Sequence, residues 1–162
     1  MKPPAAARTT LSARVLTDDE LVRQFESGAL SAFPHAEHVR LTFVYLTRHG
    51  RDETLEKMYG GLLQFAAAKG VPEKFHVTMT RAWVDLIESA RRAFPQSATA
   101  SALMASCPEL LERDALLRYY SPERLNSPEA RRAWVPPDRA RSIAVERQSN
   151  PSPDPPPESE RV

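Results

Sequence analysis

The sequence predicts an all-α protein with a single domain. Apolar residues recur at helical spacing, cap signals stand at the ends of those stretches, and no stretch shows sustained strand alternation. A length of 162 residues fits one hydrophobic core, since such cores commonly serve about 100 to 200 residues. We therefore expect a bundle of about four main helices, followed by short C-terminal helices.

Local signals place the first two helices. The first is expected over residues 17–27, because the motif T-D-D-E is a capping box in which Glu20 reaches back to the amide of Thr17. The second is expected over residues 34–48. It should end at Gly50, since glycine readily adopts the left-handed conformation that closes helices.

The third and fourth helices are the longest that the pattern predicts. The third should start after an Asp52 cap and reach Lys69, and its central pair Gly60-Gly61 indicates a close helix contact or a kink. Each glycine there costs about 1 kcal/mol relative to alanine. The fourth, over residues 72–93, is apolar around nearly two-thirds of its circumference, so we expect a central helix with Trp83 buried.

Short helices should complete the domain. Ser121 and Ser127 each precede a proline, which pairs an N-cap acceptor with a residue suited to the first helical position. The expected segments are 98–106, 108–113, 115–120 and 127–135.

The segment 116–138 combines the pair Tyr119-Tyr120 with Arg131 beside Trp134. We expect it to fold back over the domain as a strap. Arg131 would then serve as an anion-binding fork or belong to a solvated basic face.

The distribution of proline sets the expected domain boundaries. Of 15 prolines, two stand at the start of the chain and seven lie from Pro136 onward. Such ends favour extended, solvated chain and lack the apolar groups that would compensate for ordering it. We expect a disordered leader at residues 1–15, a helical domain at 16–137 and a disordered tail at 138–162.

Charge and cysteine content bear on partners and compartment. Twenty-two Lys and Arg against 21 Asp and Glu leave a net charge of +1, which gives no field for attracting nucleic acid. No run of about 18 apolar residues is present, so we expect no membrane span. The single cysteine, Cys107, cannot pair within the chain, which suits a reducing compartment, and we expect the cytoplasm.

Three histidines and one glutamate suggest a metal site. His35 and His38 lie three residues apart and share a face of the second expected helix, while Glu73 and His76 form an E-x-x-H motif. If the starts of the two helices meet, these four side chains offer nitrogen and oxygen ligands to zinc, iron or manganese. The hypothesis is a metal-dependent enzyme that acts on a small molecule.

The same residues also fit a structural role. Acids in a first turn are favoured by the helix dipole, and histidines at helix starts often only form hydrogen bonds or fill partly buried positions. Cys107 has no neighbouring histidine in sequence, and nucleotide-binding and serine-hydrolase motifs are absent. The alternative hypothesis is a non-catalytic module that binds a protein partner.

Three blocks of the chain resemble a family of small bacterial helical proteins that are usually described as hypothetical. The blocks are F-P-H-A-E-H-V-R-L-T-F-V-Y-L, V-P-E-K-F-H-V-T-M-T and L-L-R-Y-Y-S-P-E-R-L-N-S-P-E-A-R-R-A-W-V-P-P-D, and they span residues 33–138. The resemblance implies no established activity. Relatives carry H-E-T where this chain has His76-Val77-Thr78, which implies that a function requiring that acid is altered here.

Overall fold

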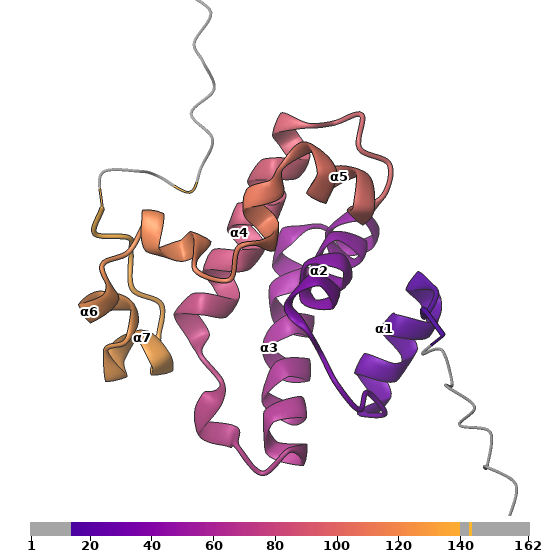
Figure 1. Cartoon of the computed structure of the whole chain (residues 1–162). Helices are drawn as coiled ribbons and strands as arrows, with labels where there is room; N and C mark the ends of the chain where they lie inside the picture. The colour runs from indigo at the N-terminus through magenta and orange to yellow at the C-terminus, as the bar shows by residue number, and fades with distance from the viewer. Residues whose placement is uncertain (1–13, 140–142, 144–162) are drawn as a thin grey trace, which may run out of the picture.

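A computed structural model of the chain describes residues 14–139 and residue 143 (Figure 1). All regular structure within these residues is helical, which confirms the expected all-α class. The expected leader and tail lie largely outside the described residues. The α-helices are α1 (Asp18–Ser27), α2 (His35–His49), α3 (Arg51–Ala68), α4 (Val77–Ala93), α5 (Ala100–Ser106), α6 (Pro122–Leu125) and α7 (Pro128–Arg132), and the 3-10 helices are η1 (Pro72–Lys74), η2 (Pro108–Leu111) and η3 (Ala115–Arg118).

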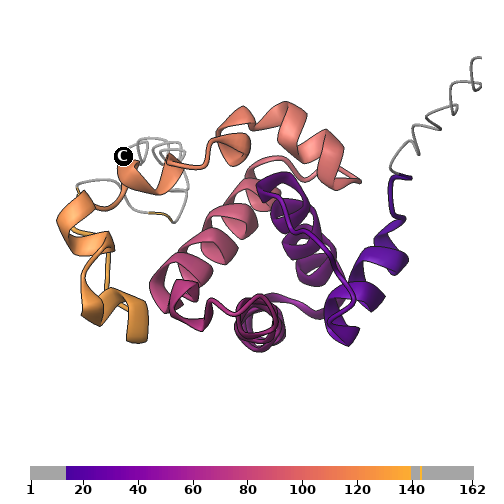
Figure 2. The ribbon, with the colours of Figure 1, turned by 60° about the horizontal axis from the view of Figure 1, so that its bottom comes forward.

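Helices α2, α3 and α4 form the centre of the fold and pack against one another in pairs. Figure 2 looks along α3 and shows α2 and α4 on either side of it. Helix α4 also contacts η3 and α7, which confirms its expected central position. The largest fully buried apolar side chains come from all three helices and their neighbours, and include Tyr45, Leu41, Met58, Ile87, Leu103, Leu110, Leu116 and Tyr120.

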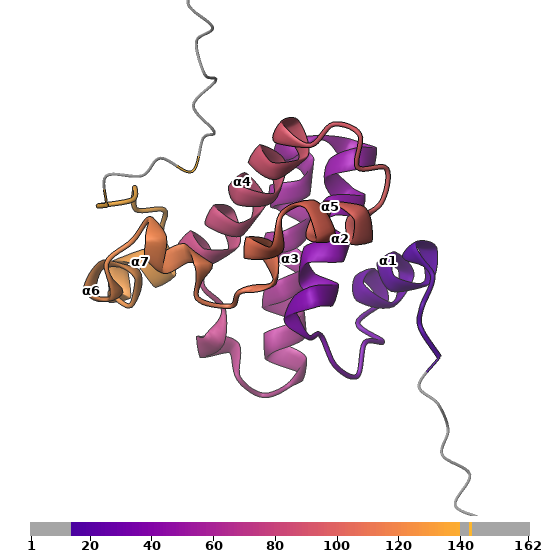
Figure 3. The ribbon, with the colours of Figure 1, turned by 45° about the horizontal axis from the view of Figure 1, so that its top comes forward.

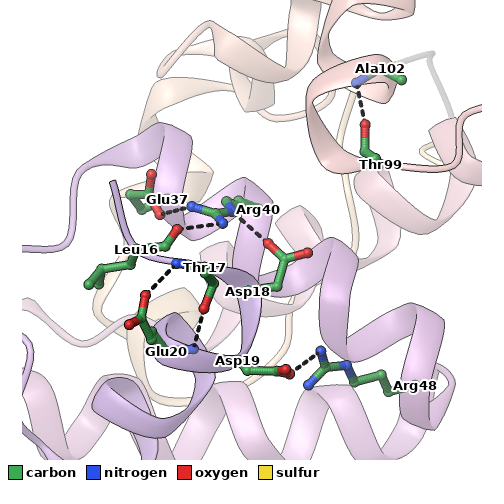
Figure 4. A network of polar contacts seen from close by, with 10 residues as sticks. All are labelled: Leu16, Thr17, Asp18, Asp19, Glu20, Glu37, Arg40, Arg48, Thr99 and Ala102. Carbon is green, nitrogen blue, oxygen red and sulfur yellow. Dashed lines mark hydrogen bonds and ion pairs between the residues drawn. The ribbon is translucent and has the colours of Figure 1, made fainter. Parts of the chain in front are cut away.

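Helix α1 begins and ends as its sequence predicts. The hydroxyl of Thr17 accepts from the amide of Glu20 at 3.2 Å, and the carboxylate of Glu20 accepts from the amide of Thr17 at 2.8 Å (Figure 4). Gly28 ends the helix with φ of 73°, in the left-handed region. These bonds satisfy end groups that have no partner inside the helix.

Arg40 of α2 connects the start of α1 to α2 (Figure 4). Its guanidinium donates to the Leu16 carbonyl at 2.7 Å and to the Asp18 carboxylate at 2.8 Å. Arg48, two turns further along α2, donates to Asp19 at 2.7 Å. Surface ion pairs contribute only about 0–1 kcal/mol each, so this network mainly sets the orientation of α1.

Gly61 allows the ring of Phe25 to reach the surface of α3. A Cβ atom at Gly61 would lie 2.2 Å from Cε1 of Phe25, a side chain that is only 3% exposed. A Cβ at Gly60 would meet nothing within 4 Å. The glycine pair therefore marks a close contact between α1 and α3, which is one of the two alternatives that the sequence offered.

We expect Gly61→Ala to lower the free energy of unfolding by about 1–3 kcal/mol, because the buried Phe25 ring must move to admit a methyl group. Gly60→Ala is the matched control. It should stabilise by up to about 1 kcal/mol, since alanine is the better helix former and meets open space. Urea unfolding followed by circular dichroism measures both. Equal effects of the two substitutions would contradict the close contact.

The start of α4 differs from the prediction. Pro72–Lys74 form a 3-10 turn, Phe75 is extended, and the α-helix begins at Val77 with His76 as its N-cap. The Nδ1 atom of His76 accepts from the amide of Met79 at 3.1 Å. A side chain that caps a helix must lie outside it, so the expected helical face shared by residues 73 and 76 does not form.

The junction of α2 and α3 also differs in detail. Gly50 has φ of 79° and ψ of −179°, so it is not in the left-handed helical region that was expected. Helix α3 starts directly at Arg51, and Asp52 lies in its first turn rather than at its cap. Glycine tolerates this backbone conformation at no steric cost, which lets two long helices follow each other without a loop.

The C-terminal strap covers the start of α4, at the opposite end of the molecule from α1 (Figures 1 and 3). Ser121 and Ser127 cap α6 and α7 as predicted. The hydroxyl of Tyr120 donates to the Val135 carbonyl at 2.9 Å. The packed region extends past the expected boundary at residue 137, because Asp138 accepts from the amide of Ser121 at 2.7 Å and Ile143 is buried.

Candidate functional site

A cavity of about 410 Å³ lies among α2, α3, η1 and the first turns of α4. Small-molecule sites in proteins commonly measure about 300–1,000 Å³. Much of its wall is apolar or aromatic, from Leu62, Phe65, Val71, Phe75, Met79 and Trp83. Two imidazoles, from His38 and His76, and the hydroxyl-bearing Thr80 also line it. The sequence did not predict this cavity.

His38 lines the cavity and has one unpaired polar atom. Its Nε2 atom is buried and has no hydrogen-bond partner among the described residues. Burial, and secondarily the neighbouring His35, lowers the pKa of His38 to about 4, so the ring is neutral near pH 7. A buried polar atom without a partner costs about 1–3 kcal/mol, which a ligand recovers only by reaching the atom past the side chains that cover it.

Both ring nitrogens of His76 form hydrogen bonds within the fold. Its Nδ1 accepts from the amide of Met79, and its Nε2 donates to the Leu125 carbonyl at 2.8 Å. These two bonds connect the start of α4 to the C-terminal strap. Burial lowers the pKa of His76, which keeps the imidazole in the neutral form that both bonds require.

His35 lies beside His38 but also serves the fold. Its Nε2 donates to the Leu110 carbonyl at 2.9 Å, and the centroid of its ring is 4.6 Å from that of Trp83. The ring centroids of His35 and His38 are 6.4 Å apart. Burial is the largest cause that lowers the pKa of His35, and the charge of Arg113 lowers it further.

The structure does not combine the four predicted ligands into one metal centre. Within the described part of the chain, no group of three or more His, Cys, Asp or Glu residues is placed to hold an ion. His76 has no free ring nitrogen, His35 uses Nε2 for a carbonyl, and Glu73 lies exposed in η1. A zinc, iron or manganese ion could bind His35 and His76 at these nitrogens only by displacing their hydrogen bonds. The four side chains, as they are placed, therefore do not fit such an ion.

Three basic residues also line the cavity, and no carboxylate does. Lys69 donates to the Ser31 carbonyl and lies 5.5 Å from the centroid of the Phe65 ring. Lys74 and Arg113 are exposed, and their side chains form no hydrogen bond or ion pair with any described residue. No local sequence signal marks this group, because Arg113 comes from a distant segment that only the fold brings beside Lys69 and Lys74.

Cys107 lies outside the cavity lining and is half-buried as a free thiol. Burial is the main cause that raises the pKa of this thiol, and Glu109 raises it further. A raised pKa leaves little of the reactive thiolate at neutral pH. The side chain therefore offers no activated nucleophile to the candidate site.

Comparison of the chain with protein-family models, curated proteins and solved structures gave no match. The family resemblance therefore stays a prediction. None of the helices in the described residues is both long and apolar enough to cross a membrane.

Proposed function

We propose that this chain binds a small, largely apolar molecule in the cavity among α2, α3 and α4. The observation that carries the proposal is a cavity of about 410 Å³ with largely apolar walls, whose lining includes His38, a residue with a buried and unpaired Nε2. Apolar walls with a few placed polar groups are typical of small-molecule sites.

Two physical effects support binding. Apolar surface removed from water stabilises a complex by about 25 cal/mol per Å², before the cost of association is subtracted. The second effect is orientation, because the few polar residues of the lining, such as His38 and Thr80, favour one placement of a ligand over others. The bonds of His76 to the Leu125 carbonyl and the Met79 amide hold one wall of the cavity in place.

The test is a titration with N-phenyl-1-naphthylamine, an uncharged apolar probe that fluoresces when it leaves water. We expect a signal that saturates at one probe per chain. Leu62→Trp should weaken binding at least about tenfold, because a larger side chain would fill part of the cavity that Leu62 lines.

The matched control is Leu63→Trp, the same substitution at the next residue, whose side chain is 47% exposed and does not line the cavity. It should leave binding of the probe unchanged. A signal that does not saturate, or equal effects of the two variants, would contradict the proposal. Either result would favour a module that binds partners through its surface.

Elemental analysis separates this proposal from a metal-dependent enzyme. Near-stoichiometric metal that is lost when His35, His38 and His76 are all replaced by alanine would favour the enzyme. It would require His76 to release its bonds to Met79 and Leu125. Metal-free protein that binds the apolar probe favours the binding function.

A further inference from the structure

The charges around the cavity are of one sign. Lys69, Lys74 and Arg113 line it, and no Asp or Glu is among its lining residues. The whole chain has a net charge of only +1, so this is a local arrangement. Apolar walls of low dielectric constant strengthen the potential of cations at the mouth of a cavity.

The three cations differ in their availability. Lys69 already donates to the Ser31 carbonyl. Lys74 and Arg113 are exposed and have no partner among the described residues, so they can turn toward a ligand. Arg113 follows η2, the turn whose Leu110 carbonyl holds His35, the neighbour of His38.

The buried Nε2 atom of His38 favours the same kind of ligand as these cations do. A neutral imidazole carries one N–H, and Nε2 of His38, which has no partner among the described residues, can carry it. Hydrogen bonds to an ionised acceptor are about twice as strong as those between neutral groups. An acceptor with negative charge would therefore gain most from this cavity.

We infer, on the basis of the proposed function, that the ligand is an organic acid with an apolar body and one carboxylate. The body lies against Leu62, Phe65 and Trp83. One carboxylate oxygen accepts from Nε2 of His38 once the side chains that cover this atom have moved, and the other faces the exposed Lys74 and Arg113. The arrangement selects an anionic acid over its neutral analogues.

A matched pair of competitors tests the charge. 1-Naphthoate and 1-naphthamide have nearly the same shape, and only the first is an anion at neutral pH. Each is titrated against N-phenyl-1-naphthylamine bound to the full chain. We expect 1-naphthoate to displace the probe at a concentration about tenfold lower, as one charge-assisted hydrogen bond provides.

Variants locate the source of that preference. The double variant Lys74→Gln/Arg113→Gln should reduce the preference for 1-naphthoate to about threefold or less and leave 1-naphthamide unchanged. Arg23→Gln removes an exposed cation of α1 that does not line the cavity and should preserve the preference. His38→Phe should weaken 1-naphthoate about tenfold, and His38→Gln should restore part of the loss through its amide N–H.

The outcomes separate the two proposals. Equal displacement of the probe by 1-naphthoate and 1-naphthamide would overturn the inference that the ligand is an organic acid. So would a preference for 1-naphthoate that the double variant retains. In either case the proposal of a cavity that binds apolar molecules would still stand. Failure of the neutral probe to bind would overturn the proposed function itself. If His38→Phe does not fold, the exposed Lys74 and Arg113 still decide the result, since their side chains form no hydrogen bond or ion pair with any described residue.

Discussion

Trp83→Ala is expected to lower the free energy of unfolding by about 3–5 kcal/mol, the usual cost of deleting a core aromatic side chain. Trp83 is 5% exposed and lies on α4, as its apolar sequence pattern predicts. Its ring packs against His35 and forms part of the cavity wall. Typical domains have only about 5–15 kcal/mol of stability, so this loss is a large fraction of it.

Urea unfolding followed by circular dichroism measures this effect without depending on tryptophan emission. Trp83→Phe is the control, because it keeps an aromatic ring beside His35 and should cost less than about half as much. In a Trp134→Phe background, the emission of Trp83 should be that of a shielded indole. Solvent-exposed emission, or a loss below about 1 kcal/mol, would show that Trp83 is not buried.

Lowering the pH from about 7 to about 5 is expected to reduce the free energy of unfolding by about 2 kcal/mol through His38 alone. Its pKa is about 4 in the folded chain and 6.5 in the unfolded chain. Between these two pH values, His38 therefore binds a proton in the unfolded chain but not in the folded chain. The stabilisation is complete above about pH 6.5 and is lost as the pH falls toward about 4.

His35 and His76 add to the effect in the same direction, because burial lowers the pKa of each. Carboxylates contribute mainly at lower pH, so the interval between about pH 5 and 7 reports on histidines. Urea unfolding at several pH values gives the slope. His38→Gln should reduce the slope by up to about one proton. Stability that is constant over this interval would contradict the burial of the three rings.

Within the described part of the chain, the sequence by itself determined the all-α class and many helix ends, because these depend on residues a few positions apart. The capping box of Thr17 and the caps at Ser121 and Ser127 are bonds between residues three positions apart. The apolar pattern likewise sufficed to predict that Trp83 is buried. Such signals operate within one turn of helix.

Tertiary contacts decided the roles of the histidines and the composition of the cavity. His35 bonds a carbonyl 75 positions away, and His76 bonds one 49 positions away. A motif such as E-x-x-H contains no information on those partners. The sequence therefore could not show that the rings of His35 and His76 form hydrogen bonds with distant backbone carbonyls. Arg113 reaches the cavity only because η2 packs against α2, a contact between segments that are distant in sequence. The sequence could supply an imidazole, a cation and an apolar wall, but only the packing of α2, α3 and α4 placed them around one cavity.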